Sequence, residues 1–109
     1  MEKLANVHPG KILNYEFLQP LKITAYRLSK DLKIPHTRIS EIIKGNRQIT
    51  ADTALRLSKY FGNSAKFWLG VQNDHDIDGE KETKGSELSE IKHFENKNVA
   101  QQKTVVKTK

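Results

Sequence analysis

The chain has 109 residues and a formal net charge of +6, a length that allows one small domain with a modest core. It contains no cysteine, which excludes a disulfide framework and a thiolate metal site. No apolar run approaches the ~20 residues of a membrane span, and the N-terminus lacks an apolar signal-peptide core, so we expect a cytoplasmic protein. The pI of about 9.6 suits a polyanionic partner.

The first expected helix covers Lys11–Gln19. Pro9 suits its first turn and Pro20 ends it, because proline cannot continue a helix interior. Four apolar residues form a stripe that predicts the face covering the core: Ile12, Leu13, Phe17 and Leu18. Leu21 and Ile23 are expected to pack beneath the loop that follows.

Two short helical patterns then meet at a three-residue junction, Lys33-Ile34-Pro35. Pro35 can begin a helix but cannot continue one, so one helix ends near Leu32 and another starts at a different angle. Thr24 can cap the first of these helices, and Gly45 is a natural residue to end the second. The apolar positions are those that pack the two helices of a helix-turn-helix unit together: Leu28, Leu32, Ile34, Ile39 and Ile42.

The polar side of the second helix is the side that would enter a DNA major groove. An apolar seam alone does not establish this, because any two helices in an all-α domain need one. The charge favours DNA, since residues 24–47 carry +4 of the formal +6, and phosphates attract such a cluster without regard to sequence. The segment has two acidic residues, Asp31 and Glu41, against six basic ones: Arg27, Lys30, Lys33, Arg38, Lys44 and Arg47.

Two further helices complete an expected five-helix bundle. Thr50 caps the fourth, which closes at Gly62, and its buried side is formed by Ala54, Leu57, Tyr60 and Phe61. Ser64 caps the fifth, which carries the most apolar and aromatic stretch of the chain. That stretch exceeds what one face can bury, so we expect part of it at a dimer interface. For Trp68, core and dimer contact are equally open.

From residue 79 onward the chain is polar and charged, with few apolar residues to anchor it. We therefore expect two parts, a helix-turn-helix DNA-binding domain at 1–78 and a flexible tail at 79–109. Ser86–Phe94 has weak helical potential. A tail that contacts DNA without sequence preference, or that folds on a partner, remains an alternative.

Motifs for other chemistry are absent or incomplete. Asp74-x-Asp76-x-Asp78-Gly79 matches the opening of a calcium loop, but the twelfth position, where a bidentate Glu is needed, is Gly85. The four histidines include no pair at i, i+4 spacing for zinc. The chain has no phosphate-binding Gly-rich loop and no suggestion of a nucleophile–base pair. We expect no enzyme activity, no metal and no cofactor.

Four elements together make a family resemblance specific: HPG, RISEIIKG, ITADTALRLSKYFG and FWL. Over His8–Ile77 the chain resembles HigA-type (VapI-like) antitoxins of the XRE, or phage-repressor-like, helix-turn-helix family. The resemblance implies a bacterial type II toxin–antitoxin module and a homodimer that binds a palindrome in its own promoter. Such a protein would be associated with the nucleoid when it is bound to its operator. The resemblance also implies a second partner, a HigB-type (RelE-like) mRNA-cleaving toxin that the antitoxin neutralises. Lys33 stands where many helix-turn-helix units have glycine.

Carried onto this sequence, the resemblance implies two sets of DNA-contact residues, and the apolar and aromatic excess of Phe67–Val71 gives a third set, for the dimer interface. Candidates for base contacts, at the start and exposed side of the recognition helix, are His36, Thr37, Arg38 and Glu41. Candidates for phosphate contacts are Thr24, Arg27, Ser40, Lys44, Asn46 and Arg47. Candidates for the dimer interface are Phe67, Trp68 and Val71. For Arg38 and Glu41 the alternative is a surface ion pair at i, i+3.

Two other functions remain open at this point. One is a solitary phage-type transcriptional regulator without a toxin partner. The other is a protein-interaction module whose helix-turn-helix unit has lost DNA binding. A toxin reading frame beside this gene distinguishes the first from an antitoxin, and a salt-dependent shift of promoter DNA excludes the second.

Overall fold

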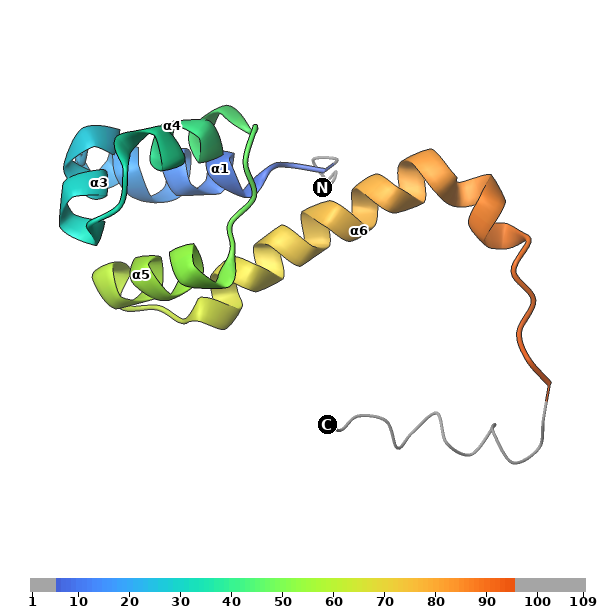
Figure 1. Cartoon of the computed structure of the whole chain (residues 1–109). Coiled ribbons are helices and arrows are strands. Elements are labelled where there is room, and N and C mark those ends of the chain that lie inside the picture. The colour runs from blue at the N-terminus through green and yellow to red at the C-terminus, as the bar shows by residue number, and fades with distance from the viewer. Residues whose placement is uncertain (1–5, 96–109) are drawn as a thin grey trace.

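The computed structural model describes residues 6–95, and every regular element in this part of the chain is helical (Figure 1). The first three elements follow one another without a break and form one helical unit, so the described chain is a bundle of five helical units, as the sequence predicts. The elements are α1 (Pro9–Ile12), the π-helix η1 (Leu13–Leu18), α2 (Gln19–Leu21), α3 (Ala25–Leu32), α4 (His36–Lys44), α5 (Ala51–Phe61) and α6 (Ala65–Ser89).

Pro20 lies inside the first helical unit instead of ending it, which corrects the expected boundary. A proline ring normally clashes with the carbonyl four residues before it. Here the preceding turns are widened to π geometry, in which the Gln19 N–H donates to the carbonyl of Asn14, five residues back. The unit ends at Lys22, which adopts a left-handed conformation. Leu21 is exposed, so its predicted burial is also wrong.

The helix-turn-helix packing is confirmed. The apolar residues predicted to join α3 and α4 are all buried, with exposures between 0% and 8%: Leu28, Leu32, Ile34, Ile39 and Ile42. The Thr24 hydroxyl caps α3 by accepting from the Arg27 N–H at 3.0 Å, and Gly45 ends α4 with a φ of 87°. Lys33 ends α3 with a φ of 60°, a left-handed conformation that glycine adopts more easily.

The last two helices begin at the predicted caps, because the hydroxyls of Thr50 and Ser64 each accept from a backbone N–H three residues on. Trp68 of α6 is fully buried, and its Nε1 donates to Asn63 Oδ1 at 2.9 Å. Its ring centroid lies 4.9 Å from that of Phe17, so the indole joins the first helical unit to the last. The Trp68 side chain is therefore part of the core and has no surface to offer a partner. Of the two places that the sequence leaves open for Trp68, core and dimer contact, the structure shows the core.

α6 continues to Ser89, well past the expected domain boundary at residue 79, and Figure 1 shows its second half extending away from the bundle. Residues 80–95 are all exposed, so burial does not hold this part of the helix against the core. The helix bends at Lys84, whose φ and ψ are −119° and 20°. The division into a domain and a flexible tail remains a prediction, and its residues 96–109 lie outside the described part of the chain.

Candidate nucleic-acid interface

The outward face of α4 is the candidate reading surface. Since successive helical residues turn by about 100°, the positions i, i+3, i+4 and i+7 share one side of the helix. The two fully buried residues of α4, Ile39 and Ile42, lie on the inner side. Four polar residues occupy the opposite side, two of them exposed and two half-buried: Thr37, Ser40, Glu41 and Lys44. His36 is exposed at the first turn.

The Pro9-Gly10 step fixes how closely the first helical unit approaches α4. A Cβ added to Gly10 would lie 1.8 Å from the carbonyl oxygen of Ile42, a distance that only glycine permits. His8 caps α1, its Nδ1 accepting from the Gly10 N–H at 2.8 Å. The triplet HPG is present in the sequence, but the need for glycine at its third position follows only from the contact with α4.

Arg38 anchors α4 to α5. Its Nη1 donates to Asp52 Oδ2 at 2.7 Å, and the Arg38 side chain is 26% exposed. This contact spans 14 residues, so the predicted local alternative, an ion pair with Glu41, is not the pairing found. Glu41 instead accepts from Asn46 Nδ2 at 3.1 Å and lies 3.9 Å from Lys44 Nζ. Arg38 thus has a positioning contact whether or not it also reaches a base.

A hollow of about 210 Å³ lies beside the start of α5. Arg38, Arg47 and Gln48 line it together with the α5 cap residue Thr50 and with Thr53 in the first turn of α5. Two guanidinium groups next to a helix N-terminus make a favourable position for an anion such as a backbone phosphate. Arg38 and Arg47, predicted for different kinds of DNA contact, are therefore brought together here.

The other predicted phosphate contacts surround α4. Thr24 and Arg27 lie at the first turn of α3, while Lys44, Asn46 and Arg47 are exposed at and after the end of α4. The aromatic rings of Tyr26 and His36, 6.0 Å apart, connect the starts of α3 and α4. The structure does not bring all these residues into one cluster. It distributes them around the outward face of α4.

The neighbouring carboxylates are held in their charged form. Hydrogen bonds from Arg38 and then from Arg56 lower the pKa of Asp52. The phenol of Tyr60, which donates to Asp31 Oδ2 at 2.6 Å, lowers the pKa of Asp31, with Arg27 adding to the effect. Both carboxylates are therefore committed to partners of this domain. Of the six basic residues at 24–47, three are in ion pairs within the described chain, and Lys30, Lys33 and Arg47 are not.

Of the predicted dimer residues, Phe67 and Val71 keep surface to contribute. Phe67 is 40% exposed and Val71 is half-buried. Two further exposed apolar residues, Leu55 on α5 and Ile77 on α6, were not singled out in the sequence, because each fits the apolar pattern of a buried position as well as a surface one. Between residues 6 and 95 no helix is both long and apolar enough to cross a membrane.

Together these features define a class of protein, a helix-turn-helix domain whose second helix presents a polar, cation-flanked face. A helix-turn-helix family profile matches residues 15–68. The chain is 46% identical over 71 residues to Virulence-associated protein I of Dichelobacter nodosus. The matched segment is 65% of this chain and 66% of the length of that relative.

Solved structures give a closer definition. The fold is similar to that of an addiction module antidote protein of the HigA family from Coxiella burnetii, with a TM-score of 0.79 and 40% identity over 84% of this chain and 100% of that one. It is also similar to the Pseudomonas aeruginosa antitoxin HigA with the higBA promoter, with a TM-score of 0.79 and 33% identity over 83% of this chain and 99% of that one. The chain belongs to the HigA-type (VapI-like) antitoxins of the XRE helix-turn-helix family.

Proposed function

We propose that this protein is the antitoxin of a type II toxin–antitoxin module and represses its own operon by binding operator DNA. The observation that carries the DNA half is the outward face of α4, where Thr37, Ser40, Glu41 and Lys44 lie on the side opposite the buried Ile39 and Ile42. A helix that packs its apolar side against the core and exposes a row of polar groups on the other side is suited to a major groove. The solved relative from Pseudomonas aeruginosa, described with its promoter, supports the same role.

We propose different tasks for the predicted DNA contacts. Thr37 can contact a thymine methyl, and Glu41, held by Asn46, can accept from a cytosine amine. His36 lies at the helix start, where base edges are within reach. Arg38 reads a base only if it leaves Asp52, so we assign it first to positioning α4 and to the hollow at α5.

Phosphate contacts come from the surroundings of α4. Ser40 and Lys44 on the helix, and Asn46 and Arg47 in the loop after it, would position the duplex, with Thr24 and Arg27 at the start of α3. Such contacts supply affinity without sequence information and make it depend steeply on salt.

One domain reads only a few base pairs, so we propose that the protein binds a palindrome as a homodimer with half-sites roughly 34–36 Å apart. Phe67 and Val71 are the residues we assign to the dimer contact, since both retain exposed surface. Sedimentation in the micromolar range tests this directly. A monomer both free and on operator DNA would show the assignment to be wrong.

For the toxin half, we propose that the partner is a HigB-type (RelE-like) mRNA-cleaving toxin that this protein neutralises. The proposal is supported by the similarity to a protein described as an addiction module antidote of the HigA family. The alternative is a solitary regulator without a toxin. Co-expression with the neighbouring reading frame separates the two, because an antitoxin rescues growth and co-purifies with the toxin. A footprint on the protein's own promoter, with no rescue and no co-purification, would favour the solitary regulator.

A further inference from the structure

Tyr26 is an aromatic residue on the surface of the domain that the proposed DNA contacts do not include. It lies in the first turn of α3, and its side chain is 60% exposed. Its hydroxyl has no hydrogen-bond partner within residues 6–95. A single exposed tyrosine is common in proteins and needs no explanation. The two side chains that contact its ring are more informative.

The first of these neighbours is His36, the residue that begins α4. The centroids of the two rings lie 6.0 Å apart, and the ring planes are inclined by 53°. This separation is within the range at which aromatic side chains attract one another. The imidazole of His36 makes no hydrogen bond or ion pair to any other residue between 6 and 95. Contact with the Tyr26 ring therefore limits the directions in which this imidazole can point.

The second neighbour is Lys30, one turn further along α3. Its ammonium nitrogen lies 5.5 Å from the centroid of the Tyr26 ring, a distance at which a cation is attracted to the face of an aromatic ring. In the described part of the chain Lys30 takes part in no ion pair that would draw it elsewhere. Lys30, Tyr26 and His36 thus form a row of contacting side chains that runs from α3 to the first turn of α4.

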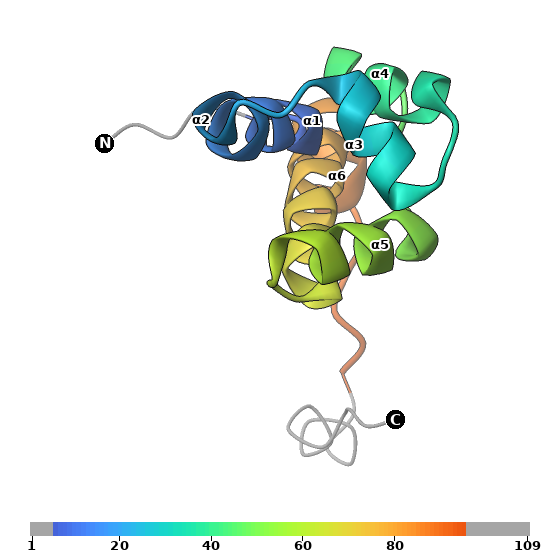
Figure 2. The same ribbon diagram turned by 90° about the vertical axis from the view of Figure 1, so that its left-hand side faces the viewer.

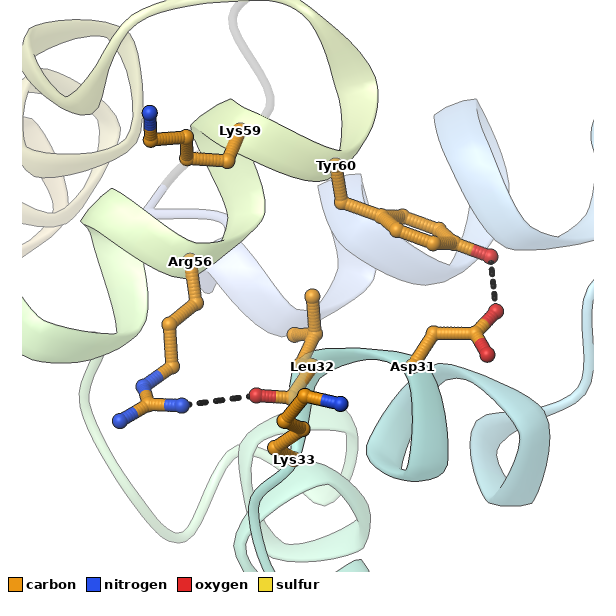
Figure 3. Close-up of a pocket in the computed structure, with 6 residues that line it drawn as sticks. All are labelled: Asp31, Leu32, Lys33, Arg56, Lys59 and Tyr60. Carbon is orange, nitrogen blue, oxygen red and sulfur yellow. Dashed lines mark hydrogen bonds between the residues drawn. The ribbon is translucent and has the colours of Figure 1, made fainter.

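The helix that carries Tyr26 is held in place at its far end. There the Tyr60 hydroxyl of α5 donates to Asp31 Oδ2 at 2.6 Å (Figure 3). Arg56, also of α5, donates through Nη1 to the carbonyl of Leu32 at 2.8 Å. Both ribbon views show α3 between α4 and α5 (Figures 1 and 2). Tyr26 therefore meets the start of α4 from a helix whose position is fixed.

We propose that Tyr26 is a positioning residue for DNA reading. Its ring keeps the His36 imidazole in the direction from which His36 contacts a base, and Lys30 keeps the ring in place. Tyr26 thereby influences the base preference at one position of each half-site without contacting that base itself. The inference rests on the proposed function, because it needs α4 to be the reading helix. It adds that a residue outside α4 contributes to the specificity.

The physical basis is preorganisation of one side chain. An exposed imidazole samples several rotamers in the free protein, and a complex that requires one of them loses affinity by selecting it. A neighbouring ring that already favours the required rotamer removes part of this loss. Because one side chain is involved, removal of the Tyr26 ring should weaken operator binding only about threefold to tenfold.

The test is a double-mutant cycle between Tyr26→Ala and His36→Ala in the full chain. The probes are the protein's own operator and a set of fragments in which each base pair of one half-site is replaced in turn. Tyr26→Phe is the conservative variant, since it keeps the ring and removes only the hydroxyl. Tyr15→Ala is the matched control, because Tyr15 is 56% exposed and lies on η1, beside Val7 and Lys11.

We expect Tyr26→Ala to weaken operator binding about threefold to tenfold, and to relax the preference at the same base pair that His36→Ala relaxes. In the His36→Ala background, Tyr26→Ala should add less than a twofold loss. Tyr26→Phe and Tyr15→Ala should each change the affinity less than twofold. Thermal unfolding of each variant establishes that a loss of binding does not come from loss of the fold.

Several results would overturn the inference and leave the proposed function intact. One is an unchanged affinity and base preference in Tyr26→Ala, and another is a His36→Ala variant that binds as the unaltered protein does. A loss of equal size in the His36→Ala background would make Tyr26 a direct DNA contact. A loss in Tyr26→Phe as large as in Tyr26→Ala would assign the effect to the hydroxyl. An unaltered protein that binds its operator no better than the altered fragments would contradict the proposed function itself, and this inference with it.

Discussion

Gly10 is the position where a single methyl group should cost most. A Cβ at this residue would lie 1.8 Å from the carbonyl oxygen of Ile42, 2.7 Å from its carbonyl carbon and 3.0 Å from the Cα of Ile43. All three atoms belong to the backbone of α4, so no side chain can rotate away. Gly10→Ala therefore has to push the first helical unit and α4 apart by more than an ångström.

The expected magnitude follows from two opposing terms. Overpacking a well-packed contact costs about 1–3 kcal/mol, and a clash with backbone is at the upper end of that range or beyond it. Alanine is a better helix former than glycine, which offsets up to about 1 kcal/mol of that cost. We expect a net loss of about 2 kcal/mol, a large fraction of the roughly 5–15 kcal/mol that stabilises a domain.

Urea unfolding measures this loss, and with a slope of about 1–3 kcal/mol per molar the midpoint should fall by about 1 M. Gly70→Ala is the control, since a Cβ added there meets nothing within 4 Å apart from its chain neighbours and the nearby backbone of its own helix, and α6 continues through this residue. The control should be stabilised by about 0.5–1 kcal/mol. Equal midpoints for Gly10→Ala and Gly70→Ala would refute the contact between α1 and α4.

Three further predictions use other parts of the structure. Lys33→Gly, which relieves a φ of 60°, should raise the free energy of unfolding by about 0.5–1 kcal/mol in the same urea assay, and a decrease would contradict it. Burial, followed by the charge of His75, lowers the pKa of His8. As the pH falls, His8 is therefore protonated in the unfolded chain at a higher pH than in the folded one. Stability should therefore fall as the pH drops below about 6.5, and His8→Asn should flatten that dependence; parallel curves would refute it. On DNA, Thr37→Ala should cost on the order of 1–3 kcal/mol at one base pair, whereas Lys44→Ala should weaken binding to all sequences and reduce the salt slope by about one. Operator titrations across salt distinguish the two, and toxin rescue should survive both changes; folded variants that lose rescue would show that toxin and DNA share this face.

The features with local signals are the ones that could be predicted from the sequence. Thr24, Thr50 and Ser64 act as caps through bonds that reach only three residues along the chain. The apolar seam of the helix-turn-helix unit repeats at helical spacing, and its members are buried as expected. The likeness of the chain to HigA-type antitoxins could be recognised for the same reason, since its motifs are short and contiguous.

What could not be predicted depends on contacts between distant residues. Arg38 turns to Asp52, 14 residues away, and the local pattern offered only Glu41. Trp68 is buried because Phe17, in the first helical unit, packs against it, and composition alone left core and interface equally open. The helix beyond residue 79 was missed for the opposite reason. Its residues are exposed and mostly polar, and only the weak pattern at Ser86–Phe94 indicated a helix there.

The account depends on one claim above the others, that the outward face of α4 reads a particular DNA sequence. The direct measurement is a competition titration at physiological salt, in which the purified full chain is bound to its own promoter fragment and displaced by a shuffled fragment of equal length. Specific readers bind their site typically ~10³-fold or more tightly than other DNA, and we predict a preference of at least that size. Equal affinity for the two fragments would leave only the attraction of a basic surface for phosphates, and would contradict the assignment of α4 as a reading helix.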